Sequence, residues 1–139
     1  SPLFLKPFNH MPTIFQKIIA REIPAEIVWE DTDHIAFLTI EPLQPGHLLV
    51  VPKIAADYVF DMDDRAYSEL FLAAKKLADP LLRATKAGRI AVLIEGLEVD
   101  HVHIHLVPIT KPGDLNPKNL RKASEEELAI MAERIRAEL

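Results

Sequence analysis

The apolar positions of the chain change their spacing several times, and each spacing predicts an element. A capping box at Thr13–Gln16 precedes apolar residues at helical spacing, which predicts a short helix that Pro24 ends. Apolar residues then alternate with polar ones or run together over 26–30, 35–40 and 47–51. Both patterns are typical of strands. The first half of the chain is therefore expected to hold one helix and three strands.

The second half continues with longer elements. Acidic residues at 61–64 open a predicted helix that runs to about residue 86, with a kink or break expected near Pro80. The run 89–95 contains five consecutive apolar residues and predicts a strand buried on both faces. A second capping box, Ser124–Glu127, predicts a C-terminal helix.

The order of these elements predicts an α+β fold. We expect a mainly antiparallel central sheet of about five strands with a short N-terminal helix, one long helix and a C-terminal helix. A length of 139 residues suits one domain, expected over residues 11–139. Residues 1–10 end in the Asn-His that precedes Met11, a junction typical of cloning. They are therefore expected to be vector-derived, with Met11 as the natural start.

Composition narrows the function classes. The net charge of −5 argues against a nucleic-acid partner, because phosphate backbones bind cationic proteins. The chain has no cysteine, which excludes disulfides and thiol catalysis and fits a cytoplasmic protein. No apolar run approaches the roughly 20 residues of a membrane span. No membrane partner is therefore expected.

Three histidines alternate with apolar residues in His101-Val-His-Ile-His-Leu-Val-Pro108. On a strand, alternate side chains project from one face, about 6.5–7 Å apart, so the three imidazoles would share a face. Burying them is costly unless each finds a partner. By contrast, His34 follows the turn-forming Asp31-Thr-Asp33 and is expected to be exposed.

Three interpretations of the histidine row remain open from the residues alone. The row belongs to a half-exposed strand without chemistry, or it supplies ligands to Zn²⁺, as His-x-His pairs do. A regular strand places the first and third imidazoles roughly 13 Å apart, too far to share one ion. In the third interpretation one histidine attacks phosphorus and its neighbours donate hydrogen bonds to the phosphoryl oxygens or to the leaving group.

Two motifs resemble those of the histidine triad family. The run His101-Val-His-Ile-His-Leu-Val107 matches its signature of three histidines that alternate with apolar residues. The segment Pro42-Leu-Gln-Pro-Gly-His-Leu-Leu-Val-Val-Pro-Lys53 and the start at Thr13 are similar to its nucleotide-binding branch. The chain is thus identified as a divergent member, with the resemblance covering residues 11 to about 109.

The resemblance implies a nucleotidyl hydrolase or transferase that acts at the α-phosphate of a nucleoside phosphoramidate, an adenylylated amine or a dinucleoside polyphosphate. It makes His103 the nucleophile that forms a covalent intermediate. His101 and His105 would contact the phosphate and position the nucleophile. His47 would complete a donor relay. It also implies a homodimer whose sheet extends across the interface, and no required cofactor. Zinc stays possible but is not expected for catalysis.

The resemblance also assigns a pocket for the nucleotide base, although plain hydrophobic core is the alternative for its members. The matching apolar positions are Ile14, Phe15, Ile18, Ile23, Phe37 and Ile40. Thr39 stands where the branch typically has an aspartate that grips the ribose hydroxyls. The loop Gly96–Asp100 is shorter than usual and lacks a serine and a glutamine. These departures leave two alternatives: a nucleotide-binding signalling module with little turnover, and a zinc-binding protein that uses His47 with two triad histidines.

Overall fold

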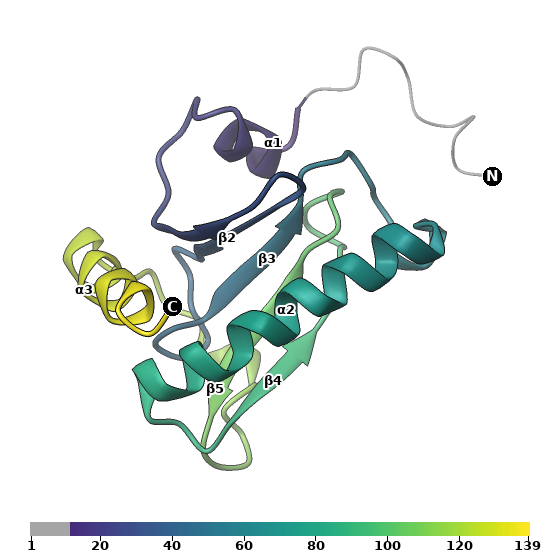
Figure 1. The fold of residues 1–139 in the computed structure, drawn as a ribbon. Helices are drawn as coiled ribbons and strands as arrows, with labels where there is room; N and C mark the ends of the chain where they lie inside the picture. Colours follow the sequence, from purple (N-terminus) through teal and green to yellow (C-terminus); the bar gives the residue numbers. More distant parts are fainter. Residues whose placement is uncertain (1–11) are drawn as a thin grey trace.

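The computed structural model describes residues 12–139, so the expected vector-derived segment and Met11 lie outside the described residues. The elements are α1 (Ile14–Ile19), β1 (Ile27–Glu30), β2 (His34–Leu38), β3 (Leu48–Pro52), η2 (Val59–Asp61), α2 (Asp64–Thr85), β4 (Arg89–Leu93), β5 (Ile104–Ile109), η3 (Pro117–Asn119) and α3 (Glu125–Arg136). The five strands form one sheet in the order β1-β2-β3-β5-β4, and every neighbouring pair is antiparallel. The predicted α+β fold is confirmed (Figure 1).

The sheet has a core on each face. The α2 side packs strand residues against α2 and α3, with Leu48, Val50, Ile104, Leu106, Leu70, Leu77, Leu81 and Ile135 at its centre. The other side packs α1 against β2 and β3 through Phe15, Ile18, Ile35, Phe37, Leu49 and Val51. Because both faces are covered, every residue of β2 and β3 is buried. β3 is the middle strand of the sheet, with His47 directly before it and His105 of β5 opposite its Leu49.

Both capping boxes are present. The Thr13 side chain accepts a hydrogen bond from the Gln16 amide at 3.1 Å, while the Thr13 amide donates to Gln16 Oε1 at 2.7 Å. Ser124 and Glu127 make the same reciprocal pair at the start of α3. α2 continues through Pro80 without a break. Among residues 12–139, no helix is long and apolar enough to cross a membrane.

Two predictions about burial are wrong. β4 is an edge strand, not a strand buried on both faces, and its Val92 and Leu93 are 55% and 39% exposed. His34 is buried, because β2 begins at this residue and its ring stacks on Trp29 with 6.5 Å between centroids. Its Nδ1 lies 3.1 Å from an Asp31 carboxylate oxygen, which satisfies the buried ring.

Candidate active site

Four histidines from three places in the chain meet on the α1 side of the sheet. His105 lies on β5, opposite Leu49 of β3, and His47 comes directly before β3. β5 begins only at Ile104, so His101 and His103 belong to the irregular segment before it. His47, His101 and His103 are buried, whereas His105 is half-buried. The sheet therefore brings together the four histidines that the sequence singled out.

A directed hydrogen-bond relay joins two of them. The Leu43 amide donates to His47 Nδ1 at 3.0 Å, and an amide nitrogen can only donate. The proton of neutral His47 must then lie on Nε2, which donates to His105 Nδ1 at 2.8 Å. Neutral His105 consequently carries its own proton on Nε2. The relay ends in an N–H donor on His105.

The same logic fixes the opposite tautomer at His103. Its Nδ1 lies 2.7 Å from the His101 carbonyl oxygen, which can only accept, so Nδ1 carries the proton. Nε2 then holds the lone pair. Within residues 12–139 no hydrogen bond engages this nitrogen. The lone pair of His103 Nε2 is thus unpaired among the described residues.

His101 is held by the segment that follows β3. Its Nε2 lies 2.7 Å from the Pro52 carbonyl oxygen and donates to it. The next amide, that of Val102, donates to the Ala56 carbonyl at 2.7 Å. Only 1% of the His101 surface is exposed. The segment 52–56 therefore places the carbonyl that orients His103.

Burial keeps all four rings neutral. Desolvation lowers the pKa of His47 to about 3, with the neighbouring His105 and His103 adding to the effect. Desolvation, and then the nearby His103, lowers the pKa of His105 to about 4. The pKa values of His101 and His103 are also lowered, chiefly by burial. At neutral pH the cluster is therefore uncharged. His103 Nε2 offers a lone pair, and His105 Nε2 offers an N–H donor.

An apolar wall stands beside His103. The Phe15 ring meets the His103 ring edge-on, with centroids 4.7 Å apart, and meets Phe37 at 5.6 Å. Ile18 belongs to the same buried cluster, and Ile23 packs at its margin. Ile14 and Ile40 lie outside this cluster and are 48% and 53% exposed. The structure thus groups four of the six apolar base-pocket candidates.

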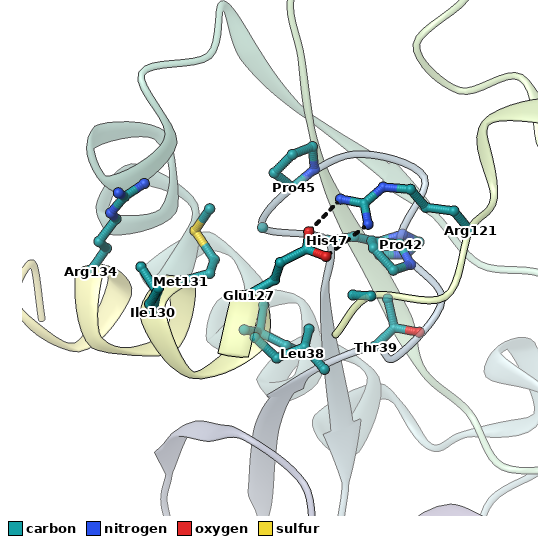
Figure 2. A pocket seen from close by; sticks show the side chains of 13 residues that line it. Leu38, Thr39, Pro42, Pro45, His47, Arg121, Glu127, Ile130, Met131 and Arg134 are labelled. Atoms are coloured by element: carbon teal, nitrogen blue, oxygen red, sulfur yellow. Dashed lines mark hydrogen bonds and ion pairs between the residues drawn. The ribbon is translucent and has the colours of Figure 1, made fainter. Parts of the chain in front are cut away.

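Thr39 has a local partner. Its hydroxyl accepts a hydrogen bond from the Glu41 amide at 3.2 Å. Thr39 and His47 line a hollow of about 220 Å³ between the 39–47 segment and α3, where Arg121 pairs with Glu127 (Figure 2). None of the three triad histidines lines this hollow, so it adjoins the histidine cluster only at His47.

The loop 110–123 packs against the segment that carries Thr39 and the relay. Gln44 donates to the Asp114 carbonyl at 3.0 Å, and the Ala123 amide donates to the Ile40 carbonyl at 2.9 Å. The Asp114 carboxylate accepts from the amides of Thr110 and Lys111. The sequence offered no signal for Gln44, and only a weak turn signal for Asp114. The loop thus braces the 39–47 segment.

The cluster does not have the geometry of a metal centre. Across the described range 12–139, no three His, Cys, Asp or Glu side chains are grouped so that they could hold an ion. Each of the four histidines instead directs at least one ring nitrogen to a backbone group or to another ring.

Known proteins share both the sequence pattern and the fold. The family model for the HIT domain matches residues 20–111. The purine nucleoside phosphoramidase of Escherichia coli is 37% identical over 101 residues, covering 68% of this chain and 85% of its own length. The adenosine 5′-monophosphoramidase of Saccharomyces cerevisiae is 39% identical over 100 residues, covering 68% of this chain and 61% of its own.

A solved structure extends the likeness to nearly the whole chain. It is that of a Hit-like protein involved in cell-cycle regulation from Bartonella henselae. It superposes with a TM-score of 0.83 and 34% identity, covering 91% of this chain and 96% of the other. The residues that match the HIT domain model, 20–111, contain all four histidines of the cluster.

Proposed function

Because the chain belongs to the histidine triad (HIT) family, we propose that it cleaves a nucleotidyl bond at the α-phosphate through a covalent intermediate on His103. The two relatives described above are named as phosphoramidases. Their names favour a phosphorus–nitrogen bond of a nucleoside phosphoramidate as the substrate, with a dinucleoside polyphosphate as a second class. The chain would act as a hydrolase, or as a transferase when another nucleophile replaces water.

The observation that carries this proposal is the polarity of the hydrogen bonds. The His101 carbonyl leaves the lone pair of His103 on Nε2, and the relay from Leu43 through His47 leaves a proton on His105 Nε2. The two rings are neighbours, with centroids 4.7 Å apart. A nucleophile beside an N–H donor suits attack on phosphorus with a hydrogen bond donated to the phosphoryl oxygens or to the leaving group.

The proposed chemistry runs in two displacements. His103 Nε2 attacks the α-phosphorus and the bond to the leaving nitrogen breaks, with that nitrogen departing as an amine after taking a proton from solvent. The neutral His105 donates a hydrogen bond from Nε2 to a phosphoryl oxygen or to the leaving nitrogen and keeps its proton. The product is a nucleotidyl group on His103, whose Nδ1–H still donates to the His101 carbonyl. Water then attacks phosphorus and releases a proton to solvent while the phosphorus–Nε2 bond breaks. Two inversions give net retention and ping-pong kinetics.

The neighbours take supporting roles. His47 orients His105 and fixes its tautomer, while the buried His101 positions His103 through its carbonyl. The wall of Phe15, Ile18, Ile23 and Phe37 would pack against the nucleotide base, with Ile14 and Ile40 at the margin. Aromatic edges and aliphatic side chains suit a flat heterocycle.

The test compares the wild type with His103→Ala on nucleoside 5′-phosphoramidates and dinucleoside polyphosphates, with chelator present. Loss of the nucleophile is expected to lower kcat by about two or more orders of magnitude. A nucleotidyl adduct on His103 should be visible by mass spectrometry after rapid acid quench. Turnover that survives in His103→Ala would contradict the assignment. Turnover that disappears in chelator and returns with Zn²⁺ would favour the metal alternative.

One observation favours the second candidate, a nucleotide-binding module with little turnover. The Thr39 hydroxyl is engaged by the Glu41 amide. Such a residue cannot grip two ribose hydroxyls as a carboxylate would. Calorimetric titration with nucleoside monophosphates separates the candidates. Tight binding that is unchanged in His103→Ala, without turnover of any substrate in the panel, would favour the binding module.

We also propose that catalysis needs no metal and that the active form is a homodimer. The directed hydrogen bonds already place a nucleophile and a donor without an ion. For the dimer, β4 is the last strand of the sheet that residues 12–139 form, and it exposes Val92 and Leu93. An open edge with apolar side chains favours antiparallel pairing with a second copy.

A further inference from the structure

Two separate supports hold His103, and neither belongs to the relay through His47. One is the Phe15 ring, which α1 brings edge-on against the His103 ring at 4.7 Å. The other is the His101 carbonyl, which accepts from His103 Nδ1 and is placed by the segment 52–56. A shift of either support would turn the imidazole or free its tautomer.

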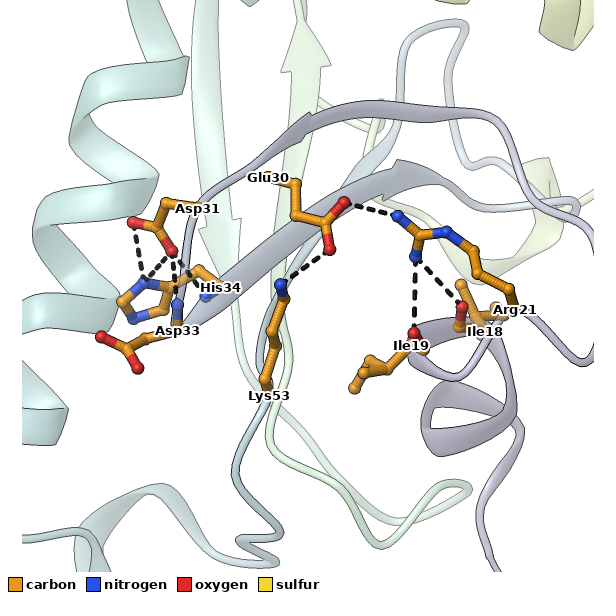
Figure 3. A network of polar contacts seen from close by, with 8 residues as sticks. All are labelled: Ile18, Ile19, Arg21, Glu30, Asp31, Asp33, His34 and Lys53. Atoms are coloured by element: carbon orange, nitrogen blue, oxygen red, sulfur yellow. Dashed lines mark hydrogen bonds and ion pairs between the residues drawn. The ribbon is translucent and has the colours of Figure 1, made fainter.

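Both supports lead to one carboxylate. Glu30 is the last residue of β1. Its Oε1 accepts a hydrogen bond from the Arg21 guanidinium, and its Oε2 lies 2.7 Å from Lys53 Nζ (Figure 3). Arg21 follows the end of α1, and Lys53 directly follows Pro52. Figure 3 shows the carboxylate between the two cations, with one arm reaching toward α1 and the other toward the end of β3.

Arg21 ties the end of α1 to Glu30. It is a non-glycine residue at φ +63°, a conformation that L residues rarely adopt and that here turns the chain after the C-cap. Its guanidinium lies 3.4 Å from the Ile18 carbonyl oxygen, which also accepts a hydrogen bond from the Arg21 amide at 3.0 Å. Arg21 thus joins the helix that carries Phe15 to the last residue of β1.

Lys53 ties the end of β3 to the same carboxylate. Its amide donates to the Asp33 carbonyl at 2.7 Å, so the backbone at residue 53 is fixed as well as the side chain. The preceding carbonyl, that of Pro52, accepts a hydrogen bond from His101 Nε2. The pKa of Glu30 is lowered, chiefly by the hydrogen bond from Lys53, so the carboxylate stays ionised at neutral pH.

We propose that Glu30 is a positioning residue for the reaction at His103, holding through Arg21 the helix that carries Phe15 and through Lys53 the strand end that orients His101. This inference rests on the proposed function. The three side chains are 32%, 51% and 26% exposed. Ion pairs this exposed contribute little to global stability, because water screens them. The effect of breaking them is therefore expected in the geometry of the site more than in folding.

The test separates the two arms. Glu30→Gln is expected to lower kcat/KM about tenfold, with the unfolding temperature nearly unchanged. Arg21→Gln should act mainly on KM, because α1 carries part of the proposed base wall. Lys53→Gln should act mainly on kcat, and Lys53→Arg should restore it by keeping the cation. Glu69→Gln is the matched control, because it breaks an exposed ion pair with Arg65 on α2 that has no contact with the histidines.

A second readout works without any substrate. The imidazole ¹⁵N shifts of His103 report which nitrogen carries the proton. The wild type and Glu69→Gln are expected to show the Nδ1–H form, and Glu30→Gln a mixture of tautomers. Unchanged shifts together with kcat and KM within twofold of the wild type would overturn the positioning role. If the shifts change while no variant, the wild type included, turns over, the positioning role stands and the proposed function fails.

Discussion

The histidines of the candidate site differ from free histidine in one property that can be measured directly. Burial lowers the pKa of His47 to about 3 and that of His105 to about 4, and it also lowers the pKa of His103. An unperturbed imidazole titrates near 6.5. The proposed nucleophile is therefore uncharged over the whole neutral range.

These shifts predict the pH dependence of activity. Protonating His103 removes the lone pair and requires a pH below 6.5, whereas protonating His105 reverses a hydrogen bond of the relay and requires a pH near 4. The value of kcat/KM is therefore expected to stay level from about pH 8 to pH 6.5 and to fall at lower pH. Stopped assays in buffers of constant ionic strength measure this profile. An acid limb centred near 6.5 would show that the histidines titrate normally.

The same shifts set the sign of the stability change. Unfolded histidines bind protons below about pH 6.5, whereas the folded ones remain neutral there. The unfolded state then holds more protons, so the free energy of unfolding is expected to fall as the pH drops from 6.5 toward 4. Urea midpoints at several pH values in that range would check the sign, with His47→Gln expected to flatten the dependence.

At this scale the sequence identified side chains but not their partners. The alternation at 101–105 and the Pro-Gly-His motif singled out the four histidines that the structure gathers. The groups that fix the tautomers are main-chain atoms of Leu43, Pro52 and His101. Every residue has a main-chain carbonyl, and every residue except proline has a main-chain N–H. A hydrogen bond from these groups therefore leaves no signal in the sequence.

The turn that delivers His47 depends on a glycine. Gly46 has φ +89°, and a Cβ there would lie 2.6 Å from Thr85 Cγ2 and 3.2 Å from Pro108 Cγ. The position needs the left-handed conformation and also close contact with α2 and β5. Gly113 has φ +94° with nothing within 4 Å of the added atom. Comparing the two positions therefore separates the cost of the left-handed backbone from the cost of a steric clash.

Alanine at these two positions is expected to have unequal effects. Gly113→Ala should lower the free energy of unfolding by about 1–2 kcal/mol, the cost of the left-handed conformation. Gly46→Ala should lower it by roughly 1–3 kcal/mol more, because of overpacking against Thr85 and Pro108. Only Gly46→Ala should also reduce kcat, since it displaces the turn that holds His47. Urea denaturation and steady-state assays measure both effects, and equal losses of stability would exclude the clash.

Features with local signals were predicted well, whereas burial that depends on neighbouring elements was not. Both capping boxes are confirmed at Thr13 and Ser124, because a cap is a contact over three residues. The run 89–95 was misjudged because an apolar run does not reveal whether a second strand or a helix covers it. His34 was misjudged because Trp29 and Asp31 bury it through contacts between β1 and β2.

The two edges of the whole sheet are not equivalent. On β1, the Arg136 guanidinium of α3 donates to the Ile27 carbonyl at 2.8 Å from Nη2, which covers part of that edge. On β4, Val92 and Leu93 are exposed although they point to opposite faces of the sheet. An exposed apolar edge favours association with another strand. The asymmetry assigns the proposed dimer contact to β4.

Antiparallel pairing of β4 with its copy about a two-fold axis would join the two sheets into one and bury Val92 of both protomers. Val92→Lys places a charge at that contact, and edge lysines oppose strand pairing. The wild type is expected to sediment at twice the monomer mass and Val92→Lys at the monomer mass. Leu120→Lys is the matched control, because Leu120 is 50% exposed in the loop 110–123, away from the sheet edge. A monomeric wild type, or a dimer that survives Val92→Lys but not Leu120→Lys, would move the interface away from β4.

If the monomeric variant keeps its full kcat, each protomer holds a complete site, as expected when all four histidines and Phe15 come from one chain.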